Sequence, residues 1–137
     1  MTGSILGALL QRALHVATWN IRRRLPAARR ADAWRTRAPR LRAALQLEQP
    51  HVLAVQEAMP DQATFVRDAL GEHHRVLGRG RSASGGDEAC LLVVDEARVE
   101  VLDWWQQALS DDPQRAGSRG WGNVLPRVLV AAELRDR

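Results

Sequence analysis

The 137-residue sequence contains no lysine, a single cysteine and no long apolar run. Cys90 cannot form a disulfide within the chain, and its apolar neighbours predict a small buried hydrophobe. No segment approaches the roughly 18 apolar residues of a transmembrane helix, so we expect no membrane partner. The short apolar run at residues 5–10 lacks the charged start of a secretory signal. We therefore expect a cytoplasmic protein, with residues 1–14 as an N-terminal extension of one or two helical turns, or a leader from an early start codon.

All 20 basic residues are arginine, and nine of them fall within residues 21–42. That segment contains one acid, Asp32, and has a net charge of +8; the remainder has eleven arginines, fifteen acids and a net charge of −4. A basic segment on a mildly acidic body is typical of a surface for polyanions. GC-rich coding is the alternative, although it explains the choice of arginine better than the clustering. A non-catalytic module that binds nucleic acid or another polyanion is therefore one candidate function.

The pattern of apolar residues predicts one α/β domain with a mixed sheet. We expect strands over residues 15–19, 51–55, 75–78, 89–94, 99–104 and 128–134, and helices over 38–47 and 61–70. The strands on either side of the turn at residues 95–98 are expected to form a hairpin. Pro39 suits the first turn of the first helix. Asp61 is expected to cap the second helix, and Gly71 to end it.

Two of these strands end on polar side chains. Asn20 follows an apolar run that begins at Val16, and Glu57 follows another that begins at Val52. With one helix between them, the strands can pair in parallel, which places Asn20 and Glu57 at the edge where open α/β sheets build binding sites. An amide and a carboxylate there suit a hard cation and a phosphate. Taken singly, Asn20 could be a turn residue and Glu57 an acid that precedes a helix.

Four short motifs follow one another along these elements: Trp19-Asn20, Gln56-Glu57, Gly86-Asp87-Glu88 and Leu125-Pro126-Arg127. In this order they resemble the endonuclease/exonuclease/phosphatase superfamily, which has the deoxyribonuclease-like fold of magnesium-dependent phosphoesterases. The resemblance covers residues 15–137. It implies an α/β fold, a mixed β-sheet with flanking helices that forms the N-terminal half of a four-layer α/β/β/α sandwich. It also implies phosphodiester or phosphomonoester hydrolysis with Mg²⁺, or Mn²⁺, as cofactor.

The resemblance implies roles for five residues. Glu57 would be the metal ligand, and Asn20 would hold the scissile phosphate or complete the inner shell of the metal. Glu88 would orient a catalytic histidine, although Asp87 stands before it where the family usually has glycine. Arg119 and Arg127 would bind the substrate phosphate, although an arginine at the start of a strand is more often simply solvated. The substrate would be a nucleic acid or a small phosphorylated compound.

The superfamily also uses a later histidine, an Asp and Asn pair and a closing Asp-His pair, none of which this sequence supplies. His15 and His51 begin strands, at the end opposite Asn20 and Glu57, while His73 and His74 connect a helix to a strand. With no general base in reach of an attacking water, we expect the chain alone to be impaired or inactive. A half domain with one sheet should also leave an apolar sheet face uncovered, and we expect self-association through it.

Overall fold

The computed structural model describes residues 13–26 and 29–137. Most of the predicted N-terminal extension lies outside the described residues, so its helical turns stay a prediction. The described elements are β1 (Val16–Asn20), α2 (Trp34–Glu48), β2 (Val52–Ala58), α3 (Pro60–Leu70), β3 (His74–Leu77), β4 (Ala89–Asp95), β5 (Val99–Ala108) and β6 (Val128–Asp136). None of the described helices has the length and apolar character needed to cross a membrane. The cytoplasmic location stays a prediction.

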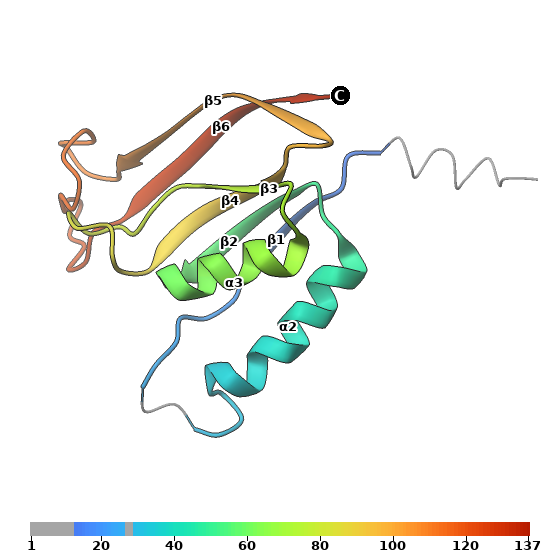
Figure 1. The fold of residues 1–137 in the computed structure, drawn as a ribbon. Helices are drawn as coiled ribbons and strands as arrows, with labels where there is room; N and C mark the ends of the chain where they lie inside the picture. The colour runs from blue at the N-terminus through green and yellow to red at the C-terminus, as the bar shows by residue number, and fades with distance from the viewer. Residues whose placement is uncertain (1–12, 27–28) are drawn as a thin grey trace, which may run out of the picture.

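A mixed four-stranded sheet has the strand order β1-β2-β4-β3. Strands β1 and β2 are parallel, with Asn20 opposite Gln56, and β4 runs antiparallel to β2 and β3. Helices α2 and α3 cover one face of this sheet (Figure 1). This arrangement confirms the α/β class, the mixed sheet with flanking helices and the parallel pairing of the first two strands.

The main core lies between this sheet and the two helices. Strand side chains alternate between the two faces of a sheet, and Leu53, Val55, Leu91 and Val93 take the helix side, each 4% exposed or less. Leu45 of α2, 1% exposed, packs into the same cluster. Full burial of such a side chain contributes about 1.5–3 kcal/mol, so this face holds the helices in place.

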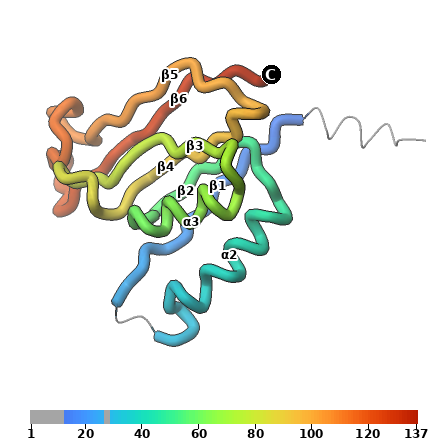
Figure 2. The backbone as a smooth tube through the Cα atoms, viewed as in Figure 1, coloured from blue at the N-terminus to red at the C-terminus, as the bar shows by residue number. Residues whose placement is uncertain are grey.

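The hairpin predicted around residues 95–98 is wrong. Strand β5 pairs with β6 in a separate two-stranded sheet, and this pair lies over the face of the first sheet that the helices leave open (Figure 2). A second cluster of buried residues lies between the sheets: Val52, Leu77, Val94 and Val99. A short polar turn between apolar runs serves a hairpin and a corner between sheets equally well, which is why the sequence pattern did not separate them. The chain therefore contributes strands to two stacked sheets instead of one.

Helix α2 begins at Trp34, four residues before the predicted start, so Pro39 lies inside it and not in its first turn. The ring of Trp34 packs edge-on against Phe65 of α3, with the ring centroids 5.1 Å apart. Aromatic pairs of this geometry add about 0.5–1.5 kcal/mol beyond the area they bury. This contact favours the early start, despite the backbone hydrogen bond that a proline removes from a helix.

Helix α3 begins at Pro60, and Met59 is its N-cap residue. Asp61 therefore lies in the first turn and is not the cap that the sequence predicted. The N–H of Met59 is satisfied instead by Gln62, whose Oε1 accepts it at 3.2 Å. Gly71 follows the last residue of the helix with φ 120°, which confirms the predicted end.

Candidate active site

The parallel pairing of β1 and β2 brings Asn20 and Glu57 into contact. The Nδ2 atom of Asn20 donates a hydrogen bond of 2.9 Å to Oε1 of Glu57. In a regular strand, Glu57 would point to the face opposite Gln56. The pairing of β2 with β4 shifts register between Val55 and Ala58, and Glu57 has φ 61°. This irregularity re-aims Glu57 toward Asn20, at a conformational cost of about 1–3 kcal/mol.

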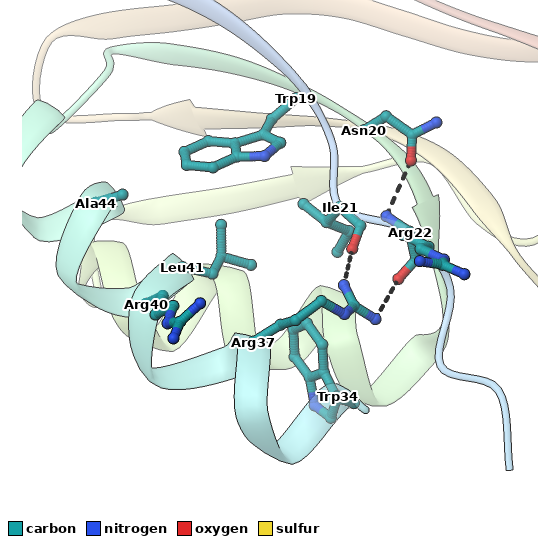
Figure 3. A pocket seen from close by; sticks show the side chains of 9 residues that line it. All are labelled: Trp19, Asn20, Ile21, Arg22, Trp34, Arg37, Arg40, Leu41 and Ala44. Atoms are coloured by element: carbon teal, nitrogen blue, oxygen red, sulfur yellow. Dashed lines mark hydrogen bonds between the residues drawn. The ribbon is translucent and has the colours of Figure 1, made fainter. Parts of the chain in front are cut away.

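Backbone N–H groups of the segment after β1 hold both side chains. The N–H of Arg23 donates to Oε2 of Glu57 at 3.2 Å, and the N–H of Arg22 donates to Oδ1 of Asn20 at 2.9 Å (Figure 3). The hydrogen bond from Asn20, followed by that from Arg23, lowers the pKa of Glu57 below its usual range, although burial opposes the shift. The pair therefore presents an ionised carboxylate beside an oriented amide.

A cavity of about 330 Å³ opens beside the pair. Four of the five predicted site residues line it: Asn20, Glu57, Glu88 and Arg127. Cys90 also lines it and is exposed, so the prediction of a buried cysteine is wrong. The reason is that Cys90 alternates with Leu91 along β4 and points away from the helices. No histidine lines this cavity in the described part of the chain.

Glu88 lies between two guanidinium groups. Its Oε1 is 2.6 Å from Nη1 of Arg81, and its Oε2 is 3.1 Å from Nη1 of Arg23. Because both oxygens are paired and the side chain is only 15% exposed, Glu88 is less available to a cation than Glu57. Its role in orienting a histidine stays a prediction.

Arg81 is a residue of the cavity lining that the sequence interpretation missed. The available signal was an arginine in a glycine-rich loop just before two acids, Asp87 and Glu88. The close approach of this loop requires Gly80, because a Cβ there would lie 2.5 Å from the backbone carbonyl oxygen of Gly85. That contact is shorter than any real Cβ contact, so the loop excludes larger residues at Gly80.

The structure does not bring Arg119 to the other predicted site residues. Its Nη1 donates to the carbonyl of Val124 at 3.1 Å. It lines a different cavity of about 570 Å³, formed by the connection between β5 and β6 together with Ala83. Its contact with a substrate phosphate stays a prediction.

The donors at the Asn20–Glu57 pair fit a Mg²⁺ ion that keeps most of its shell in water and substrate oxygens. Mg²⁺ is usually held by one or two carboxylates together with substrate phosphates, and Glu57 supplies an ionised carboxylate with Asn20 beside it. Among the described residues, no group of three or more His, Cys, Asp or Glu side chains could hold a metal ion. The chain therefore offers an open, partial set of ligands.

The arginine-rich segment is largely engaged within the fold. Five of its nine arginines contact neighbours: Arg22 with Asp32, Arg23 with Glu88, Arg24 with Asp61, Arg37 with backbone carbonyls, and Arg42 with the ring of Phe65. Each exposed ion pair contributes little to stability. Those of Arg23 and Arg24, however, join the loop after β1 to Glu88, which precedes β4, and to Asp61 of α3. Part of the clustering therefore has a structural explanation.

Comparisons with known proteins agree with this architecture. Residues 17–132 match the model of the Endonuclease/Exonuclease/phosphatase family. An endonuclease/exonuclease/phosphatase from Bacteroides vulgatus is 26% identical with a TM-score of 0.83, and the match covers 90% of this chain and 47% of that one. A mannosyl-6-phosphatase from Bacteroides thetaiotaomicron is 24% identical with a TM-score of 0.81, over 90% and 46% of the two chains. No curated protein matches.

The chain spans about half the length of these solved structures. The matched region contains the first sheet apart from Val16, both described helices and all five predicted site residues. The match to the family model covers far more than half of the sequence. The chain therefore belongs to the endonuclease/exonuclease/phosphatase family.

Proposed function

We propose that the Asn20–Glu57 pair is the metal- and phosphate-binding part of a phosphoesterase site. One observation carries this proposal: an ionised carboxylate and an amide meet at the carboxyl ends of β1 and β2, in a cavity shared with Arg127. The reaction would be hydrolysis of a phosphate ester with Mg²⁺, or Mn²⁺, as cofactor.

Each residue has a distinct role in this proposal. A bound Mg²⁺ ion would supply neutralisation of the charge that develops on phosphate, and Glu57 would hold that ion. Asn20 would hydrogen-bond a phosphate oxygen without adding charge, or complete the shell of the ion. The exposed Arg127 guanidinium could bind two phosphate oxygens at once, which gives both affinity and orientation.

The substrate would be a nucleic acid or a small phosphorylated compound. One structural neighbour is described as a mannosyl-6-phosphatase, which supports a phosphomonoester, but its 24% identity establishes a shared fold alone. The family model includes nucleases and phosphatases alike. The proposal therefore covers both ester classes.

We also propose that the isolated chain is a weak catalyst or none. A general base must lie within hydrogen-bond reach of the attacking water. In the described residues, the acids of the cavity are Glu57, which would hold the metal, and Glu88, which two arginines hold. Metal binding is therefore a better first test than turnover.

The test is Mn²⁺ binding measured by calorimetry, together with Mg²⁺- and Mn²⁺-dependent cleavage of p-nitrophenyl phosphate and bis-p-nitrophenyl phosphate. We expect Glu57→Ala to weaken Mn²⁺ binding at least about tenfold. Glu72→Ala is the matched control, because it removes an exposed carboxylate just beyond the C-terminal end of α3. Equal Mn²⁺ affinity of the wild type and Glu57→Ala would contradict the proposal.

The alternative is a non-catalytic module that binds nucleic acid or another polyanion through its arginines. Four exposed arginines of the segment make no side-chain hydrogen bond or ion pair with any described residue: Arg29, Arg30, Arg35 and Arg40. The affinity of such binding should fall steeply with salt concentration. It should not depend on Mg²⁺, and Glu57→Ala should leave it unchanged. A duplex DNA titration at two salt concentrations separates the two functions.

A further inference from the structure

The backbone just after β1 is held by a buried side chain of α3. Gln62 is 0% exposed, and its Nε2 donates to the carbonyl of Arg22 at 3.1 Å. Its Oε1 accepts the N–H of Arg24 at 2.9 Å and that of Met59 at 3.2 Å. The side-chain amide of Gln62 thus uses both its N–H donor and its oxygen acceptor in hydrogen bonds. Because the amide is buried, these bonds fix the positions of the peptide groups that it contacts.

The same backbone is held by a side chain of α2. The guanidinium of Arg37 donates to the carbonyl of Ile21 at 2.5 Å and to that of Arg22 at 3.1 Å (Figure 3). A third bond, of 2.8 Å, joins its Nε to the carbonyl of Asp32. The Arg22 carbonyl thus accepts hydrogen bonds from both helices, and we call Arg37 and Gln62 together the two-helix clamp.

The clamped segment aims two consecutive N–H groups at the candidate site. The N–H of Arg22 reaches Asn20, and that of Arg23 reaches Glu57. Arg22 has φ 56°, a left-handed conformation that non-glycine residues seldom adopt. Such conformations persist where surrounding contacts over-determine them, and the clamp bonds the carbonyls of Ile21 and Arg22 on either side.

We propose that Arg37 and Gln62 are positioning residues for the candidate site. They hold the backbone of residues 21–24 so that its N–H groups keep Asn20 and Glu57 in the orientation that binds a cation. The cation part of this inference rests on the proposed function; the positioning part rests on the hydrogen bonds alone. Neither clamp residue lines the cavity beside Asn20 and Glu57.

The main variant is Arg37→Ala, with Arg40→Ala as its matched control. Arg40 lies one turn further along α2 and, together with Arg37, lines a cavity between α2 and the end of β1 (Figure 3). It is exposed, and its side chain bonds no described residue. Amide hydrogen exchange by NMR reports the N–H groups of Arg22 and Arg23, which Arg37 does not itself bond. We expect their protection to fall at least about tenfold in Arg37→Ala relative to the amides of β4, and the Mn²⁺ dissociation constant to rise about tenfold.

Gln62→Glu is the second variant, because complete removal of a buried amide can prevent folding. Glutamate keeps the acceptor for Arg24 and Met59 but loses the donor to the Arg22 carbonyl. We expect protection at Arg22 and Arg23 to fall here as well, but less than in Arg37→Ala. Gln62→Glu removes one hydrogen bond to this backbone, whereas Arg37→Ala removes those to both Ile21 and Arg22. Arg40→Ala should match the wild type in both measurements.

The outcomes separate this inference from the proposed function. A lower unfolding temperature with unchanged protection at Arg22 and Arg23 would show that the clamp is merely structural and overturn the inference. Lost protection with an unchanged Mn²⁺ dissociation constant would overturn the link to the cation. If the wild type binds no Mn²⁺ but the variants lose protection, the positioning of Asn20 and Glu57 stands and the proposed metal function fails.

Discussion

The two faces of the four-stranded sheet differ in how completely they are covered. The face toward α2 and α3 buries Leu53 and Val55 to 1% exposure. The opposite face is buried beneath β5 and β6, where Leu77 and Val94 are 0% exposed, but Val16 of β1 is 61% exposed. An apolar strand sequence therefore shows that a strand can be buried, whereas the neighbours in space decide whether it is.

The expectation of a bare inner face is thus wrong over β3 and β4 and holds only over β1. Strand β1 pairs with β2 alone and forms an edge of the sheet, yet it carries no charge or proline, the usual protections of an edge strand. Its residues Val16 and Trp19 are 61% and 38% exposed. This edge is therefore a surface through which two copies can associate.

The largest expected difference between the two faces is in their contribution to stability. Leu53→Ala, on the helix side, should lower the free energy of unfolding by about 2–5 kcal/mol. Val16→Ala, on the uncovered part of the other face, should change it by less than about 0.5 kcal/mol. Urea denaturation of both variants measures this contrast, and similar losses would mean that β1 is covered in solution.

Self-association tests the uncovered part directly. We expect the purified chain to form dimers or larger species by light scattering, through the β1 edge and the exposed face beside it. Val16→Arg should weaken this association at least about tenfold, or about 1.4 kcal/mol, because two copies would bring their added charges together. Leu47→Arg is the control, because Leu47 is also exposed, at 81%, but belongs to α2. It should leave association unchanged. A monomeric wild type would contradict the expectation.

On the face of the first sheet that the helices cover, the described residues include one buried polar side chain without a hydrogen bond. His74 is 8% exposed, and neither ring nitrogen has a hydrogen-bond partner in residues 13–26 or 29–137. An unsatisfied buried polar group costs about 1–3 kcal/mol, so His74→Leu should raise the free energy of unfolding by about 1 kcal/mol. The neighbouring exposed His73→Leu serves as control in the same urea titration. A destabilised His74→Leu would mean that a partner such as water satisfies the ring.

The smallest expected effect concerns pH at the end of β1. The pKa of Glu57 is lowered in the fold, so its ionised form stabilises the protein above the pKa of the unfolded chain. That stabilisation is lost as pH falls through the lower, folded pKa. Asn20→Ala removes the largest cause of the lowered pKa. The free energy of unfolding of this variant should therefore change less with pH than that of the wild type. Urea denaturation at several values from neutral pH to about pH 3 measures this difference. Thr18→Ala is the control: it removes only an uncharged partner of Gln56, so its stability should keep the pH dependence of the wild type.

Local sequence predicted the strands, the end of α3 at Gly71 and the meeting of Asn20 with Glu57. The last followed because parallel strands joined by one helix bring their carboxyl ends to the same edge. The start of α2 was not predictable in the same way, since it depends on a contact between Trp34 and Phe65, which lie far apart in the sequence. The ion pair of Arg23 with Glu88 could not be predicted for the same reason, because the two residues also lie far apart in the sequence.

The sequence by itself determined the alternation of apolar residues, the order of the elements and the polar side chains at two strand ends. These properties depend on residues that are near one another along the chain. The tertiary structure alone decided that β5 leaves the first sheet, that Arg119 lies away from Glu57, and that two helices clamp the backbone after β1. Each of these depends on contacts between distant segments, which form only when apolar burial brings those segments together.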